Sequence, residues 1–208
     1  YNFAKLIIKL INNVADVINH DPRVNDMIKV VFIPDYKVSL AEVLIPAADV
    51  SIQSSTAGFE ASGTGNMKFA LNGALTVGTY DGANIEIREA VGADNFYLFG
   101  LREEQIQEMR KNNAYNPRAC YENSEYLRRI LNAVNSNMFC EKDYVLLFKV
   151  IYEELLNRDY YFLLADLEAF NKALHDAEKD YTNPQKWAKK AIINVAKIGY
   201  FSSDRAVM

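Results

Sequence analysis

One lysine of this chain, Lys68, follows a loop of small residues and precedes a short apolar stretch. Lys68 comes after the run Gly63-Thr-Gly65-Asn-Met and before Phe-Ala-Leu, which places it in the opening of a predicted helix. Glycines at 58, 63 and 65 let the backbone adopt positive φ and approach a ligand closely. The first N–H groups of a helix have no intrahelical partners and favour an anion. The pattern therefore predicts an amine beside an anion-binding backbone.

The residues around Lys68 extend this chemistry. Burial among its apolar neighbours at 67 and 69–71 is expected to remove water from the amine, and desolvation favours the neutral, nucleophilic form of lysine. Such an amine suits a cofactor that carries both an aldehyde and a phosphate, and pyridoxal 5′-phosphate is that cofactor. From the residues alone the alternative is a solvated helix lysine, with Ser62 and Thr64 acting as simple helix N-caps.

The composition is that of an ordinary folded domain and disfavours several classes of protein. The chain has 208 residues, of which 50% are apolar and 24% charged, and its formal net charge is -4. Nucleic-acid binders are usually basic, so no nucleic-acid partner is expected. We see no signal peptide and no apolar run long enough to cross a bilayer. The two cysteines, Cys120 and Cys140, form no CxxC pair, and we predict a reducing, cytoplasmic location without membrane contact.

Imidazole chemistry is not indicated. The only histidines are His20 and His175, which are far apart in the sequence. We therefore predict no metal site and no Ser-His-Asp triad.

Apolar spacing predicts an α/β part over residues 1–100 and a helical part over 101–208. Strands are predicted at 28–33, 49–52, 74–77 and 95–99, and helices at 3–20, 39–45, around Lys68, 103–111, 122–134, 142–157, 163–180 and 184–198. Asp81, Gly82 and Asn84 are expected to build a turn and the start of a short helix that runs through Ile87. Strands that alternate with helices imply a parallel sheet, in which ligands bind beyond the carboxyl ends of the strands. Tyr36 and the loop 54–64 both follow predicted strands, so we expect them on one rim of the sheet.

The lysine motif and its flanks resemble a known family. Glu60-Ala-Ser-Gly-Thr-Gly-Asn-Met-Lys68, followed by Asn72-Gly-Ala-Leu, is similar to the pyridoxal-phosphate attachment signature of the α-glucan (glycogen, starch or maltodextrin) phosphorylases. Other segments are similar to the family in the same order: Asn19-His-Asp-Pro, Ile45-Pro-Ala-Ala-Asp, Ser55-Thr-Ala-Gly, Asp81-Gly-Ala-Asn and Phe201-Ser-Ser-Asp-Arg. The resemblance runs from one end of the chain to the other.

This resemblance implies an enzyme that cleaves α-1,4-glucan ends with inorganic phosphate to give α-glucose 1-phosphate. Its fold would be a Rossmann-like region of a two-domain glycosyltransferase, followed by helices. Lys68 would form an aldimine with the pyridoxal aldehyde, and the 5′-phosphate of the cofactor would donate and accept a proton. The cofactor phosphate would be lined by Tyr36, Lys37, Val38, Thr64 and Gly65. The glucosyl hydroxyls would be contacted by Glu60, Ser62 and Gly63.

Whole members of the family are several times longer, so the chain is expected to be the later part of the C-terminal, cofactor-binding domain. Catalysis by the isolated chain is not expected, and the homodimer contacts and allosteric control typical of the family depend on the rest of the enzyme. One alternative is a non-catalytic module that binds phosphate or the cofactor. A dinucleotide-binding oxidoreductase is a poorer alternative, because no G-x-G-x-x-G is followed by a suitable acidic residue.

Overall fold

The computed structural model describes residues 1–24 and 26–208, which form two compact units. The first unit comprises Tyr1–Tyr36 and Asn116–Tyr160, and the second comprises Lys37–Tyr115 and Tyr161–Met208. Neither unit is continuous in sequence, because the chain leaves the first unit after Tyr36 and re-enters it at Asn116. The division into parts 1–100 and 101–208 stays a prediction.

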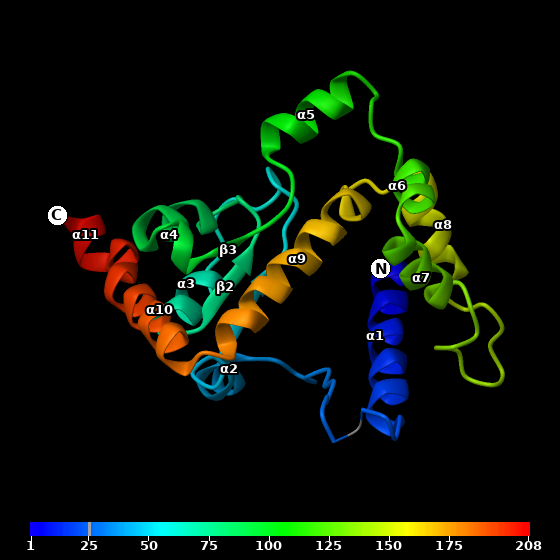
Figure 1. Cartoon of the computed structure of the whole chain (residues 1–208), viewed down its shortest axis with the longest axis horizontal. Helices are drawn as coiled ribbons and strands as arrows, with labels where there is room; N and C mark the ends of the chain where they lie inside the picture. The colour runs from blue at the N-terminus through cyan, green and yellow to red at the C-terminus, as the bar shows by residue number, and fades with distance from the viewer. Residues whose placement is uncertain (25) are drawn as a thin grey trace. The chain divides into compact units, whose positions relative to one another are not determined.

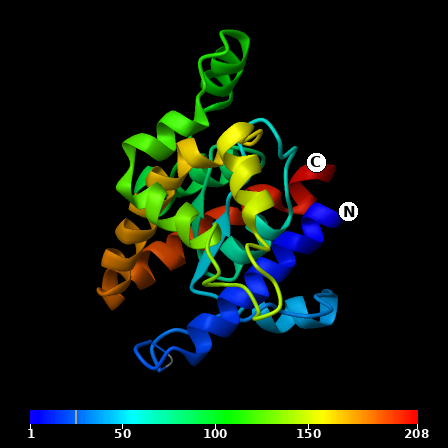
Figure 2. The same cartoon turned by 90° about the vertical axis from the view of Figure 1, so that its right-hand side faces the viewer.

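The first unit is helical. Its longest element, α1 (Asn2–His20), is one unbroken helix in both views (Figures 1 and 2). Three shorter helices pack on one another: α6 (Pro117–Asn123), α7 (Glu125–Val134) and α8 (Lys149–Asn157). Leu127 and Leu131 from α7 and Ile151 from α8 are buried, together with Phe148 just before α8. Apolar residues four apart on α7 therefore form its inner face.

The second unit is built on a parallel sheet, as predicted. Strands β1 (Val50–Gln53), β2 (Leu75–Gly78) and β3 (Tyr97–Leu98) pair in the order β1-β2-β3, with Val50 opposite Leu75 and Val77 opposite Tyr97. The crossovers are α3 (Gly65–Leu71) and α4 (Asn84–Val91). The other elements are α2 (Val38–Leu44), α5 (Glu103–Lys111), α9 (Leu163–Tyr181), α10 (Pro184–Lys197) and α11 (Ser203–Val207), with 3-10 turns η1 (Ala93–Asn95) and η2 (Ile198–Phe201).

Helices cover both faces of this sheet (Figure 1). On one face, Leu75, Val77, Tyr97 and Phe99 pack with residues of α9 and with Trp187 of α10. On the other face, Phe96 and Leu98 pack with residues of α3, α4 and η2. Successive side chains of a strand point to opposite faces, so the alternation from Phe96 to Phe99 supplies both cores.

The predicted strand at 28–33 was wrong. Residues 28–33 form no regular element, and Ile28, Val31 and Phe32 are exposed. The backbone of Val30 bonds to a side chain instead of a strand: its N–H donates to Asn19 Oδ1 at 2.9 Å, and its carbonyl accepts from Asn19 Nδ2 at 2.7 Å. A strand requires a neighbouring backbone for its ladder, and at Val30 the side-chain amide of Asn19 in α1 takes the place of such a backbone.

Two helix boundaries also differ from the prediction. The helix predicted at 122–134 is broken at Ser124, whose side chain accepts from Leu127 N–H at 3.2 Å and starts α7. The helix predicted at 142–157 begins only at Lys149. Leu146 has φ +50, and its N–H donates to Asn137 Oδ1 at 2.8 Å. The residues before Lys149 therefore form turns and not a helix. Within the described residues, no helix has the length and apolar character that a bilayer crossing requires.

Candidate functional site

The loop before Lys68 leaves the carboxyl end of β1 and enters α3. Gly58 has φ +89 and Gly63 has φ +79, as the sequence predicts for loop glycines. Gly65 was wrongly expected to share this conformation, because it is the first residue of α3. A Cβ at Gly65 would meet nothing within 4 Å, so the backbone faces open space there.

A buried carboxylate shapes the first half of this loop. Asp81, in the turn after β2, is 5% exposed. Its Oδ1 accepts from Gly58 N–H at 2.9 Å, and its Oδ2 accepts from Glu60 N–H at 2.8 Å. The next residue, Gly82, has φ +50, and a Cβ there would lie 2.7 Å from the Ser62 carbonyl oxygen. The close approach of these two segments therefore requires glycine at 82.

A buried amide shapes the second half. Asn84 is 2% exposed, and its Oδ1 accepts from Asn66 Nδ2 at 3.0 Å, while its own Nδ2 donates to the Thr79 carbonyl at 3.1 Å. Between these contacts, Ala83 N–H donates to the Ser62 carbonyl at 2.7 Å. We call residues 81–84 the 81–84 turn. It contacts the loop 58–66 at both ends and in the middle.

Sequence reasoning assigned Asp81, Gly82 and Asn84 only to a turn and a helix start. The structure confirms the turn and adds its contacts with the loop 18 to 23 residues earlier. The signal in the sequence was the Asp-Gly-Ala-Asn run itself, since Asp and Asn can satisfy backbone groups and Gly tolerates positive φ. The pattern does not say which backbone groups they satisfy.

Lys68 lies on the exposed side of α3. The buried residues of that helix are Asn66 and Ala70, four apart on one face, and Lys68 falls between them on the other side. The expectation that its apolar neighbours bury the amine was therefore wrong for this chain. Thr64 is also exposed and sits one turn before the lysine, with Lys68 N–H donating to the Thr64 carbonyl at 3.2 Å. The hydroxyl and the amine thus share one open face.

A cavity of about 240 Å³ adjoins this face. Helix α3 contributes Met67, Lys68 and Leu71 to its lining. The rest of the lining comes from Ile198, Gly199, Phe201 and Ser202. Leu71 is 56% exposed although it is apolar. The open face therefore combines one cation, one hydroxyl and an apolar surface.

The sugar-contact residues expected from the resemblance lie along the loop. Glu60 and Ser62 are exposed, and Glu60 Oε1 accepts from Ser62 N–H at 3.5 Å. Ser62 Oγ donates to the Gly63 carbonyl at 3.1 Å, so it does not cap α3, and the Thr64 side chain makes no capping hydrogen bond either. Their roles toward a sugar stay predictions.

The structure places the three other predicted phosphate contacts, Tyr36, Lys37 and Val38, before or at the start of α2 and not after a strand. Tyr36 is the last residue of the first segment of the first unit, and it follows no strand. Lys37 is the N-cap residue of α2, which Val38 begins. The chain passes from α2 into the amino end of β1, whereas the loop leaves the carboxyl end of that strand. The expected common rim rested on the strand at 28–33, which the structure does not contain.

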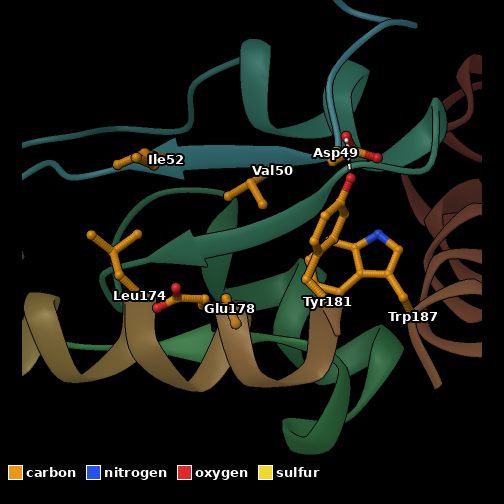
Figure 3. A pocket seen from close by; sticks show the side chains of 8 residues that line it. Asp49, Val50, Ile52, Leu174, Glu178, Tyr181 and Trp187 are labelled. Carbon is orange, nitrogen blue, oxygen red and sulfur yellow. Dashed lines mark hydrogen bonds between the residues drawn. The ribbon is translucent and has the colours of Figure 1, made fainter. Parts of the chain in front are cut away.

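A larger cavity lies at the outer edge of the sheet and lacks a cationic group. It has a volume of about 430 Å³ between β1 and α9, where Val50 and Ile52 face Leu174 (Figure 3). Tyr181 closes one end by donating to Asp49 Oδ2 at 3.3 Å. Its charged lining residues, Asp49 and Glu178, are both acidic and would repel a phosphate. The cavity beside Lys68 is the better match to an anionic cofactor.

The fold and the site together define an α/β protein whose parallel sheet supports a glycine-containing loop and an exposed lysine. A family model for carbohydrate phosphorylases matches residues 1–208, and the chain belongs to that family. The resemblance found in the sequence is thereby confirmed.

Curated relatives match over the whole chain. It is 53% identical to the glycogen phosphorylase of Chlamydia trachomatis serovar D, 49% to that of Synechocystis sp. and 48% to the brain form from Homo sapiens. These matches cover 100% of this chain, but only 25%, 24% and 24% of the respective relatives. The chain therefore spans about a quarter of the length of these relatives.

Proposed function

We propose that this chain is the cofactor-binding part of a glycogen phosphorylase, with Lys68 as the attachment point of pyridoxal 5′-phosphate. The whole enzyme would transfer glucosyl units from α-1,4-glucan ends to inorganic phosphate and release α-glucose 1-phosphate. The observation that carries this proposal is the exposed Lys68 amine on α3, behind the loop held by Asp81 and Asn84, in a chain that matches glycogen phosphorylases along its entire length.

The residues on the open face suit the cofactor. An aldehyde cofactor requires an amine that it can reach, and the Lys68 side chain is exposed. Thr64 offers a hydroxyl one turn away, and the backbone at Gly65 has room for a group to approach. When bound, the cofactor supplies a phosphate that exchanges a proton with the substrate phosphate. This chain forms one wall of such a site, because Lys68 and Leu71 remain open to solvent.

The other predicted site residues would bind either the cofactor phosphate or the sugar. Thr64 and Gly65 would hold the cofactor phosphate, with Tyr36, Lys37 and Val38 joining them in the assembled enzyme. Glu60, Ser62 and Gly63 would orient the glucosyl hydroxyls. Backbone amides and cations can keep two phosphates close together despite their like charge. A homodimer in the cytoplasm is the expected state of the whole enzyme.

The test is glucose 1-phosphate formation from glycogen and inorganic phosphate. A full-length protein that contains this chain should be active. Lys68→Ala should lower its rate by about 10²–10⁴-fold, because loss of the attachment point would remove the cofactor phosphate, and this is the usual loss when a proton-transfer group is removed. Lys172→Ala removes another exposed lysine and should leave the rate unchanged. Full activity of the Lys68→Ala protein would refute the proposal.

The same assay separates the proposal from the alternative of a non-catalytic module. We expect no glucose 1-phosphate from the 208-residue chain alone, because this chain would supply only one wall of the proposed site. If the full-length protein bound pyridoxal phosphate yet formed no glucose 1-phosphate, the module would be the better description.

A further inference from the structure

We infer that Asp81 and Asn84 are positioning residues, which set the conformation of the loop 58–66 and so the placement of Lys68. The inference rests on the proposed function, because it concerns the same site. The side chains of Asp81 and Asn84 are each more than nine-tenths buried, and their polar atoms bond to this loop.

The 81–84 turn can serve as a reference because it is tied to the sheet. Thr79, directly after β2, accepts from Asn84 Nδ2 through its carbonyl at 3.1 Å. The Thr79 hydroxyl donates to the Ser55 carbonyl at 2.6 Å, at the start of the loop. The central strand β2 is buried along its whole length. A loop bonded to such an element takes its position from the sheet.

Each half of the loop has its own bond to the turn. Asp81 accepts from Gly58 and Glu60, so the residue predicted to meet the sugar is held through its own N–H. Asn84 accepts from Asn66, which lies two residues before Lys68 and whose Oδ1 also accepts from Met67 N–H at 2.9 Å. One turn therefore connects the predicted sugar contact to the helix that carries the lysine.

Asp81→Asn tests the first connection with little change in size. An amide group keeps one acceptor but brings an NH₂ against one of the two backbone donors. In the 208-residue chain without cofactor, amide hydrogen exchange at Gly58 and Glu60 should accelerate about tenfold or more, the effect expected from losing a hydrogen bond to a charged group. Exchange at the β2 amides should not change. Asp94→Asn, at an exposed acidic residue after α4, is the matched control.

Gly82→Ala tests the turn without altering a hydrogen-bonding group. Its Cβ would lie 2.7 Å from the Ser62 carbonyl and would force the loop to shift. We expect faster exchange in the loop 58–66, with protection of β2 retained. This variant also covers the case in which Asp81→Asn fails to fold.

Reductive trapping of pyridoxal phosphate on lysines then tests positioning. The ratio of adduct at Lys68 to adduct at Lys172 should fall several-fold in Asp81→Asn and Gly82→Ala and stay at the wild-type value in Asp94→Asn. General destabilisation would also lower this ratio, but it would accelerate exchange at the β2 amides, so retained protection of β2 separates the two causes. Faster loop exchange with an unchanged ratio would overturn the positioning role, and so would unchanged loop exchange in both variants. A wild-type chain without preference for Lys68 would refute the cofactor proposal, and the turn would then be judged on exchange alone.

Discussion

At the residue scale, two glycines two positions apart in one loop have different tasks. Gly63 has φ +79, a conformation that other residues adopt only with strain. Gly65 is helical, and a Cβ on it would meet nothing within 4 Å. Folding therefore explains the glycine at 63 but not the glycine at 65. The proposed site would explain the second, because the cofactor phosphate would approach the backbone there.

Gly65→Ala should separate stability from binding. A helical alanine is at least as favourable as glycine, so we expect the free energy of unfolding to stay within about 0.5 kcal/mol of wild type or to rise. Binding of pyridoxal phosphate, measured by absorbance titration, should weaken at least about tenfold, equivalent to about 1.4 kcal/mol. Glu108→Ala, at an exposed position of α5 outside the cavity beside Lys68, is the control. Unchanged binding by Gly65→Ala would show that the phosphate lies elsewhere.

At the element scale, one buried carboxylate joins α9, α10 and β3. Asp180 of α9 accepts from the Tyr97 hydroxyl at 3.0 Å and pairs with Lys190 at 2.6 Å and with Lys186. Burial alone would raise the pKa of Asp180, but hydrogen bonds from Lys186, Lys190 and Tyr97 outweigh it and lower the pKa to about 2. Burial, followed by the bond to Asp180, raises the pKa of Tyr97.

This network should make the second unit sensitive to acid. Because the pKa of Asp180 is lower in the folded chain than in the unfolded chain, its contribution is complete above about pH 5 and is lost as the pH falls toward 2. The loss should be on the order of 1–2 kcal/mol after allowance for solvent screening. Asp180→Asn should cost about 3–5 kcal/mol at pH 7, since Lys190 stays buried without its partner.

Urea unfolding at pH 7 and pH 3 measures both effects. Asp176→Asn is the matched control, because its ion pair with Lys172 is exposed and should be worth less than about 1 kcal/mol. If Asp180→Asn were as stable as Asp176→Asn at pH 7, the network would not join these elements as we describe.

Local patterns predicted the elements that depend on local chemistry. The bounds of α5, the start of α9 and the parallel sheet all agree with the sequence, because apolar spacing specifies them. The predicted strand at 28–33 has an equally apolar pattern, but no strand forms there. A strand needs a partner backbone, and a local sequence pattern does not show whether one is present. The hydrogen bonds from Gly58 and Glu60 to Asp81 were missed for the same reason, since they join residues 21 and 23 positions apart.

At the scale of the whole molecule, the chain corresponds to about a quarter of the length of its relatives. Several large apolar side chains are exposed, among them Met27, Ile28 and Val31 in the first unit and Ile52 on the edge strand β1. An open strand edge with apolar side chains is a surface that proteins normally cover. Lys68 and Leu71 are open in the same way. The structure therefore describes a loop and a lysine-bearing helix that form locally, with the proposed site left open to solvent by this chain.

Peptide mapping of a reduced complex tests the central claim most directly. The 208-residue chain would be incubated with pyridoxal phosphate and reduced with borohydride, and the modified lysines identified by mass spectrometry. We predict a pyridoxyl adduct concentrated on Lys68 and absent from that peptide in Lys68→Ala. Adducts spread evenly over exposed lysines such as Lys172, with no preference for Lys68, would contradict the claim that this loop and helix form a cofactor site.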